Sequence, residues 1–223
     1  MTLRLLVADD QELVRAGLVA VLATQPDFEV VAEAADGLQA IEEARRHRPD
    51  VALVDIRMPH LDGIGATGQI CADARLSTRV LILTTFDLDE YVWAALRAGA
   101  SGFLLKDAPR ETLYTAVRTV AAGDALLAPS VTRRLIELHL RIDEPSPPVV
   151  RRLAALTDRE REVLCLLARG LTNDEIATDL HLAEPTVRTH VGRVYAKAGV
   201  RDRAQAVVFA YESGLVRAGQ STR

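Results

Sequence analysis

The chain has 223 residues, of which 49% are hydrophobic and 26% are charged, a composition typical of water-soluble globular proteins and a length that allows one or two domains. No apolar run approaches the roughly 18 residues of a membrane-spanning helix, and the first residues lead into a strand pattern without an export signal. The sequence therefore predicts a cytoplasmic protein that makes no membrane contact, with Cys71 and Cys165 as reduced packing residues.

The net charge of −4 hides an uneven distribution. Residues 1–150 carry 15 basic and 22 acidic side chains, whereas residues 151–223 carry 12 basic and 9 acidic side chains. The net charges of the two parts are therefore −7 and +3. This asymmetry indicates that a polyanionic partner meets only the C-terminal part of the chain.

Apolar runs and helical patterns alternate through the first 123 residues. The strand patterns cover residues 3–8, 28–34, 51–55, 79–83 and 102–105, and each is followed by a segment with helical periodicity. The third of these helical segments spans roughly residues 65–74. Strict alternation of this kind predicts an α/β fold built on a five-stranded doubly wound parallel sheet.

Four of the predicted strands end in side chains that can do chemistry. Asp9 and Asp10 follow the first strand, Asp55 ends the third, Thr84 follows the fourth and Lys106 follows the fifth. In an open parallel sheet the carboxyl ends of the strands lie along one rim, where these folds bind their ligands. We therefore expect the five side chains to converge on one site.

The expected site suits phosphoryl transfer assisted by a magnesium ion. Three carboxylates on one rim repel one another unless a cation lies among them, and Mg²⁺ prefers such hard oxygen ligands. The Thr84 hydroxyl and the Lys106 ammonium can donate to phosphoryl oxygens, and Asp55 would be the nucleophile that forms an acyl phosphate. Only two of the 27 basic residues are lysines, so composition alone would place a lysine at this strand end about one time in thirteen.

The pattern loosens between residues 124 and 150. Residues 131–140 fit a helix, but three prolines at positions 145, 147 and 148 interrupt any helical pattern that follows. Such a segment is typical of a linker, which we place near residues 141–150. The predicted organisation is a first domain at residues 1–123, a linker with a helix at 124–150, and a second domain at 151–223.

The second domain is predicted to be a small all-α domain of four helices. Thr157 and Thr172 each begin a capping box of the form Thr-x-x-Glu, and Asp202 begins the last helix. A three-residue turn joins the second helix to a basic third helix, the arrangement of a helix-turn-helix that reads DNA with its second member. Ala183 stands where a serine or threonine cap is usual, a loss of about 1 kcal/mol of helix stability.

The basic third helix presents an exposed stripe opposite its valines. Side chains on such a stripe can read base edges, and flanking basic or polar groups can contact phosphates. Gly192 removes a side chain from the stripe, so we expect sparse direct readout of bases. The predicted DNA-contacting residues are Thr172, Asn173, Thr186, Arg188, Thr189, Gly192, Arg193 and Lys197.

The order Asp-Asp, Asp-x-x-Met-Pro, Thr and Lys at the strand ends resembles the CheY-like receiver domain of two-component response regulators. The C-terminal domain is similar to the LuxR-type helix-turn-helix, and together the two resemble the NarL/FixJ class over nearly the whole chain. Asp107 stands where many receivers have a proline, a departure that this class often shows.

The resemblance also implies roles for individual residues. It implies that Asp55 accepts a phosphoryl group from a sensor histidine kinase, and that Thr84 and Phe103 are a switch pair reporting to the face of the fourth and fifth helices. The implied magnesium ligands are Asp9 (through water), Asp10, Asp55 and the backbone carbonyl of Arg57. The implied partners are double-stranded promoter DNA, a second copy of the phosphorylated chain and RNA polymerase.

The leading hypothesis is a DNA-binding transcriptional regulator switched by phosphorylation, not an enzyme. Phosphorylation would free the C-terminal domain or promote dimerisation, so that two recognition helices engage adjacent half-sites. The alternative is a LuxR-type regulator whose DNA binding does not depend on phosphorylation. A phosphatase of the haloacid-dehalogenase type would need a second aspartate as general acid where this chain has Arg57, so turnover is not expected.

A literal match to the dinucleotide-binding fingerprint is set aside on context. Gly63, Gly65 and Gly68 have its spacing. The fingerprint needs its first glycine at the end of a strand, where the helix amides face a pyrophosphate. Here residues 57–62, including Pro59, separate the third strand from Gly63, so we expect no nucleotide site.

Overall fold

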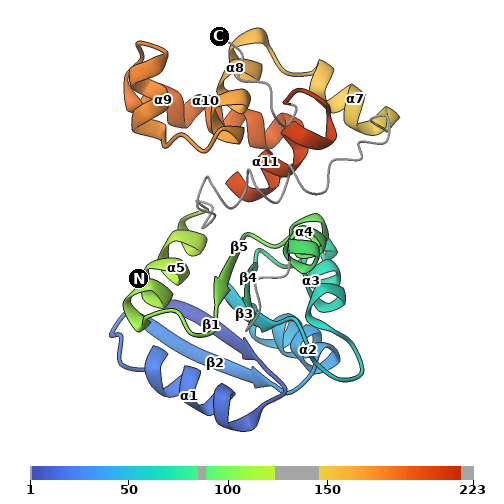
Figure 1. Ribbon diagram of the computed structural model, residues 1–223, viewed down its shortest axis with the longest axis vertical. Helices are drawn as coiled ribbons and strands as arrows, with labels where there is room; N and C mark the ends of the chain where they lie inside the picture. Colours follow the sequence, from blue (N-terminus) through green and yellow to red (C-terminus); the bar gives the residue numbers. More distant parts are fainter. Residues whose placement is uncertain (1, 85–88, 124–145, 217–223) are drawn as a thin grey trace. The chain divides into compact units, whose positions relative to one another are not determined.

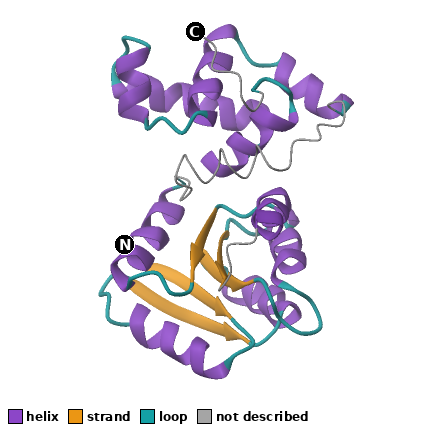
Figure 2. Ribbon diagram, viewed as in Figure 1, coloured by secondary structure: helices purple, strands orange, loops and turns teal. Residues whose placement is uncertain are grey.

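Five parallel strands form one sheet in the N-terminal part of the chain (Figure 1, Figure 2). The structure, a computed structural model, describes residues 2–84, 89–123 and 146–216. The strands lie in the order β2-β1-β3-β4-β5, with bounds β1 Leu3–Ala8, β2 Phe28–Ala34, β3 Val51–Asp55, β4 Arg79–Thr84 and β5 Gly102–Leu105. The order reverses between β1 and β3, so the carboxyl ends of these two strands flank the crevice where such folds bind ligands.

Helices cover both faces of the sheet (Figure 1). On one face α1 (Glu12–Leu22) and α5 (Arg110–Ala122) pack against the strands. On the other face lie α2 (Gly37–His47), α3 (Gly63–Ala72) and α4 (Asp89–Ala98). The predicted α/β class with a doubly wound parallel sheet is therefore confirmed.

β3 is buried on both of its faces. Val51 and Leu53 belong to the core under α1 and α5, and Ala52 and Val54 belong to the core under α2, α3 and α4. A strand with two covered faces needs an unbroken apolar run, which is why this segment lacks the usual alternation of polar and apolar residues. The strand carries the Asp55 carboxylate to the edge of the sheet, where it is only 6% exposed.

The second compact unit is helical in its described part (Figure 2). Its helices are α7 (Pro147–Ala154), α8 (Asp158–Ala168), α9 (Asn173–Asp179), α10 (Glu184–Ala198) and α11 (Arg203–Glu212). Buried aliphatic side chains of α8, α9 and α10 form one core. Among the described residues, no helix combines the length and the apolar character needed to cross a lipid bilayer.

The helix starts in this unit follow the predicted caps. Thr157 and Thr172 each accept the N–H of the glutamate three residues further on, and that glutamate accepts the threonine N–H in return. The Asp202 side chain caps α11, whereas α10 begins after Ala183 without any side-chain cap. Each satisfied cap pairs backbone donors that the first helical turn would otherwise leave without partners.

Two boundaries differ from the sequence prediction. We placed residues 141–150 in a linker because three prolines interrupt the helical pattern there, but α7 begins at Pro147 because a proline in the first turn has no N–H that the helix needs. α3 begins at Gly63 and not near residue 65, because the Asp62 side chain accepts the N–H of Gly65 and caps the helix earlier. The predicted helix at residues 131–140 lies outside the described residues.

Candidate functional sites

The five predicted rim residues lie at one edge of the sheet. Ala8 pairs with Val54, which brings Asp9 and Asp10 beside Asp55 at the ends of β1 and β3. Thr84 is the last residue of β4, and the Lys106 backbone N–H donates to its carbonyl at 2.7 Å. The parallel register of four neighbouring strands therefore brings the five residues to one rim, as the sequence predicted.

Lys106 is the centre of this arrangement. Its Nζ lies 2.7 Å from Asp9 Oδ2 and 3.0 Å from Asp55 Oδ2. All three side chains are at least nine-tenths buried, with exposed fractions of 9%, 1% and 8% respectively. The other Asp9 oxygen, Oδ1, accepts the backbone N–H of Gln11 at 3.0 Å. The ammonium therefore joins the ends of β1, β3 and β5 into one electrostatic unit.

The pKa values of Asp55 and Lys106 are both raised, but for different reasons. Burial raises the pKa of the Asp55 carboxyl above its ordinary value, although the hydrogen bond and the charge of Lys106 oppose that shift. Burial alone would lower the pKa of Lys106, but its hydrogen bonds to Asp9 and Asp55 outweigh burial and raise it. The lysine is therefore an ammonium at neutral pH, and a further cation would favour the ionised, nucleophilic form of Asp55.

The carboxylates fit a divalent cation. Asp9, Asp10 and Asp55 each offer an oxygen, and these oxygens lie within 4.8 Å of one another. Lys106 supplies one positive charge against three carboxylates, which leaves an excess of negative charge in a largely buried place. Mg²⁺ prefers hard oxygen ligands and keeps several water ligands. The exposed side chain of Asp10 leaves one side of the cluster accessible to such water.

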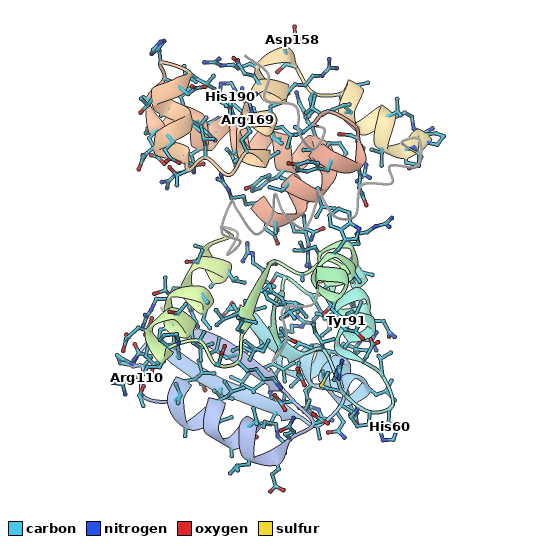
Figure 3. The ribbon with its side chains drawn as sticks, viewed as in Figure 1. His60, Tyr91, Arg110, Asp158, Arg169 and His190 are labelled. Carbon is cyan, nitrogen blue, oxygen red and sulfur yellow. The ribbon has the colours of Figure 1, made fainter. Side chains whose placement is uncertain are left out.

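The remaining residues of the predicted receiver site lie around this cluster. Thr84 is 7% exposed at the end of β4. Phe103, in β5, lies opposite Ile82 of β4. It is partly buried and packs against the core on the sheet face that α2, α3 and α4 cover. The Arg57 guanidinium carbon lies 5.8 Å from the ring centroid of Tyr91, which projects from α4 (Figure 3). Thus the loop after β3 contacts α4 through a side chain.

Gly63 lies against the end of β3 for a steric reason. A Cβ atom at this position would be 1.9 Å from the Asp55 carbonyl oxygen, and the Gly63 N–H donates to the Ile56 carbonyl at 2.9 Å. Only a residue without a side chain lets α3 begin so close to the acceptor strand. The first glycine of the apparent dinucleotide fingerprint is therefore explained by packing.

The helix-turn-helix consists of α9 and α10. On α10, Val187, Val191 and Val194 are buried, and the predicted stripe faces outward. A Cβ at Gly192 would meet no atom within 4 Å, so this position is open surface. The exposed residues among the predicted DNA contacts are Thr172, Thr186, Arg188, Thr189, Gly192, Arg193 and Lys197, and Asn173 is half-buried.

Two basic residues of α10 have acidic partners. Arg188 donates to Glu184 Oε1 through Nε at 3.1 Å and Nη2 at 2.7 Å, one helical turn away. Lys197 Nζ donates to Glu160 Oε2 at 2.6 Å, across to the first turn of α8. The second contact joins two helices, so Lys197 contributes to the position of α10 as well as to its charge.

Sequence reasoning did not identify several residues that position these sites. Arg15 Nη1 donates to the Asp9 carbonyl at 2.8 Å, and Arg152 Nη1 donates to the Ala198 carbonyl at the end of α10 at 3.0 Å. Glu160 was interpreted only as half of a capping box. Each contact joins residues from different elements, and no local pattern of residue types signals it.

Comparisons with known proteins agree with this geometry. The model of the response regulator receiver domain matches residues 5–118. The model of bacterial regulatory proteins of the luxR family matches residues 154–210. The two matches coincide with the strand-rich unit and with the helical unit described above.

Similar whole proteins share both parts. The transcriptional regulatory protein YxjL of Bacillus subtilis is 43% identical over 216 residues, 96% of this chain and 98% of that protein. The response regulator protein VraR of Staphylococcus aureus is 38% identical over 217 residues, 97% of this chain and 100% of that protein. The crystal structure of the response regulator ChrA, from a heme-sensing two-component system, has a TM-score of 0.52 at 38% identity and covers 96% of this chain and 99% of that one.

Proposed function

This chain belongs to the response regulators that join a receiver domain to a LuxR-type DNA-binding domain, and from that premise we propose how its own residues carry out the switch. Members of this family are transcription factors and not enzymes, and phosphorylation by a histidine kinase is their general mechanism. We assign the phosphoacceptor role to Asp55, with a sensor histidine kinase as the donor.

The observation that carries this assignment is the ammonium of Lys106 between two buried carboxylates, 2.7 Å from Asp9 and 3.0 Å from Asp55. In the transfer, an Asp55 carboxylate oxygen forms a bond to phosphorus while the bond from phosphorus to the kinase histidine nitrogen breaks. Lys106 and the Thr84 hydroxyl then donate to the phosphoryl oxygens. Positioning and charge neutralisation, both provided by side chains on this rim, are what such a transfer needs.

Receiver domains generally bind Mg²⁺ through acidic residues, and the acidic cluster here fits that role. We propose that Asp10 and Asp55, the Arg57 carbonyl and, through water, Asp9 hold the ion. When bound, it would neutralise charge on the phosphoryl oxygens. Asp9 would then keep its contact with Lys106, and the burial of Asp55 would exclude competing water from the acyl phosphate.

The proposed switch runs through Thr84 and Phe103. Thr84 would turn towards the phosphoryl group, and Phe103, partly buried beside it in β5, would follow into the space that Thr84 leaves. This movement would alter the face formed by α4, β5 and α5. In a two-state receiver, the shift in the equilibrium between the two states is set by how much more strongly one state interacts with the phosphoryl group than the other.

The proposed output is binding of promoter DNA by α10. Arg188 and Thr189 would read base edges beside the open position at Gly192, and Thr172, Asn173, Thr186, Arg193 and Lys197 would contact the backbone. A phosphorylated homodimer would place two such helices on adjacent half-sites. The proposed location is the cytoplasm, and RNA polymerase is a further proposed partner. The alternative, DNA binding that ignores phosphorylation, would leave the buried charges of the rim without a role.

The test uses purified full-length protein with Mg²⁺ and acetyl phosphate. Intact mass and light scattering are recorded for the wild type and for Asp55→Ala. We expect a phosphoryl adduct and a shift towards dimer in the wild type, and neither in the variant. An adduct without dimerisation would favour release of the DNA-binding domain as the switch. Absence of an adduct, even with a histidine kinase as donor, would contradict the proposal and leave the phosphorylation-independent regulator.

A further inference from the structure

Every polar group of Asp9 has a partner, and one of these partners has no role in the site as proposed above. The backbone N–H of Asp9 donates to the Ala34 carbonyl, Oδ1 accepts from Gln11, and Oδ2 pairs with Lys106. The Asp9 carbonyl accepts from Arg15 Nη1 at 2.8 Å. Because β1 ends at Ala8, this carbonyl lies beyond the strand, and the guanidinium replaces the partner that a sheet would give it.

The carbonyl held by Arg15 belongs to the peptide unit that joins Asp9 to Asp10. A peptide unit is planar, so holding its oxygen restrains the ψ angle of Asp9 and the φ angle of Asp10 together. Those two angles set the directions in which the carboxylates leave the backbone. Asp10 is exposed, so packing constrains its carboxylate little, and the orientation of this peptide, which sets where the side chain leaves the backbone, is a main restraint on its position.

Arg15 is itself held in place. Its Nε donates to Glu33 Oε2 at 3.2 Å, and its side chain is only 17% exposed. Glu33 lies on β2, next to Ala34, which pairs with Ala8 at the end of β1. The guanidinium, on α1, therefore connects β2 to the turn that carries both acidic residues.

We infer that Arg15 is a positioning residue for magnesium: by holding the Asp9–Asp10 peptide, it sets the geometry of the acidic pair. This inference rests on the magnesium site proposed above. Partners of this kind, one shell removed from the ion, typically change metal affinity by 10–100-fold when they are removed. Arg15 does not touch the ion; it acts through the backbone.

The positioning role and the charge of Arg15 have opposite effects, which makes the inference testable. A positive charge near an acidic site disfavours a second cation, so loss of Arg15 through Coulomb effects alone would tighten Mg²⁺ binding. Loss of positioning would weaken it. The sign of the change in Kd therefore separates the two.

The experiment is a calorimetric titration of Mg²⁺ into unphosphorylated full-length protein, with thermal unfolding recorded in zero and saturating Mg²⁺. We expect Arg15→Met, which keeps the apolar stem, to raise the Kd for Mg²⁺ about ten-fold and to reduce the stabilisation that Mg²⁺ gives. Arg15→Lys keeps the charge but cannot hold both partners, and should also bind more weakly. If Arg15→Met folds poorly, Arg15→Lys alone still tests the inference, because with the charge kept, weaker binding of Mg²⁺ indicates loss of positioning and unchanged binding contradicts it.

Two controls complete the design. Arg46→Met removes an exposed arginine of the same domain, paired with Glu42 and Glu43, and should leave the Kd within two-fold. Asp10→Ala should abolish binding if the proposed site is right. This inference alone would be overturned if both Arg15 variants bound Mg²⁺ as tightly as the wild type, or more tightly, while Asp10→Ala did not bind it. A wild type that binds no Mg²⁺, or an Asp10→Ala variant that binds normally, would overturn the proposed metal site and this inference with it.

Discussion

Glu160 illustrates how the role of a single residue depends on what the fold places beside it. It is 3% exposed, completes the capping box of α8 and accepts a hydrogen bond from Lys197, which is 37 positions away. The Lys197 hydrogen bond, and after it the Thr157 backbone N–H, lower the pKa of Glu160 to about 2. Lys197 therefore already has an anionic partner, with which a DNA phosphate would have to compete.

This pair predicts acid sensitivity in the helical domain. A carboxyl group whose folded pKa lies below its unfolded value stabilises the fold above the unfolded value, near 4.5, and this contribution is lost as the pH falls towards 2. Because Lys197 is partly exposed, we expect a contribution on the order of 2 kcal/mol. Glu160→Gln should remove this part of the pH dependence of unfolding between pH 5 and 2.5.

Urea unfolding followed by circular dichroism would measure it, while fluorescence of Trp93, the only tryptophan, follows the receiver separately. Glu175→Gln is the matched control, since Glu175 completes the same kind of capping box in α9 but is exposed. Equal pH profiles for wild type and Glu160→Gln would show that the buried pair does not stabilise the domain.

Residues whose role follows from a local sequence pattern could be identified from the sequence, whereas residues whose role depends on contacts between distant elements could not. Asp55 and Lys106 follow strand patterns, and the convergence of strand ends is a general property of parallel sheets, so their proximity was predictable. The contacts of Arg15 with Asp9 and of Lys197 with Glu160 depend on the packing of particular helices, which residue periodicity does not specify. The same holds for Gly63, because the reason that this position cannot carry a Cβ atom is seen only when α3 is placed against β3.

At the scale of elements, helix starts were predictable where the cap is a side chain. α8, α9 and α11 start at predicted Thr and Asp caps. Residues 147–150, the first half of α7, were assigned to the linker because their prolines were treated as helix breakers, although a proline is well tolerated in the first turn. The strand bounds agreed within one residue because unbroken apolar runs mark buried parallel strands.

The uncapped start of α10 gives a prediction for this element. Ala183 has φ −77° and ψ 142°, the extended geometry of an N-cap, but no side-chain oxygen to accept a backbone N–H. Ala183→Ser should therefore stabilise the helical domain by about 1 kcal/mol, which raises the Tm of a domain of this size by roughly 4–8 °C. Thermal unfolding followed by circular dichroism measures the change.

The control for this substitution is Ala196→Ser, an exposed position inside the same helix. There a serine has no cap to form and lowers helix propensity slightly, so the Tm should fall or stay the same. A rise for both variants, or for neither, would mean that the first turn of α10 is satisfied in another way.

At the scale of the whole molecule, charge is divided between the two parts of the chain. Residues 1–150 have a net charge of −7, and residues 151–223 have a net charge of +3. The part that holds the acidic site is therefore repelled by a nucleic acid that the other part binds. We therefore expect the DNA affinity of the full-length protein to come mainly from the cations of the helical domain, so that loss of one contact is visible in the salt dependence of binding.

Arg193 offers the clearest test of this idea, because it is exposed on α10. Each phosphate contact contributes close to one unit to the slope of log K against log salt, so Arg193→Ala should reduce the slope by about one for each bound subunit. We expect a reduction of about one in the unphosphorylated protein and about two after treatment with acetyl phosphate, because the proposed dimer would place two copies of α10 on the DNA. Fluorescence anisotropy between 50 and 200 mM salt, on duplexes selected from a random pool by the phosphorylated wild type, measures both slopes.

Arg110→Ala removes an exposed arginine from α5 of the receiver (Figure 3) and should leave the slope unchanged in both states. Since both arginines change the net charge of the chain equally, a difference between them isolates local contact with DNA from overall charge. If Arg193→Ala changes the slope by the same amount before and after phosphorylation, the number of recognition helices on the DNA does not change. Phosphorylation would then act by exposing the DNA-binding domain and not by pairing two copies of it.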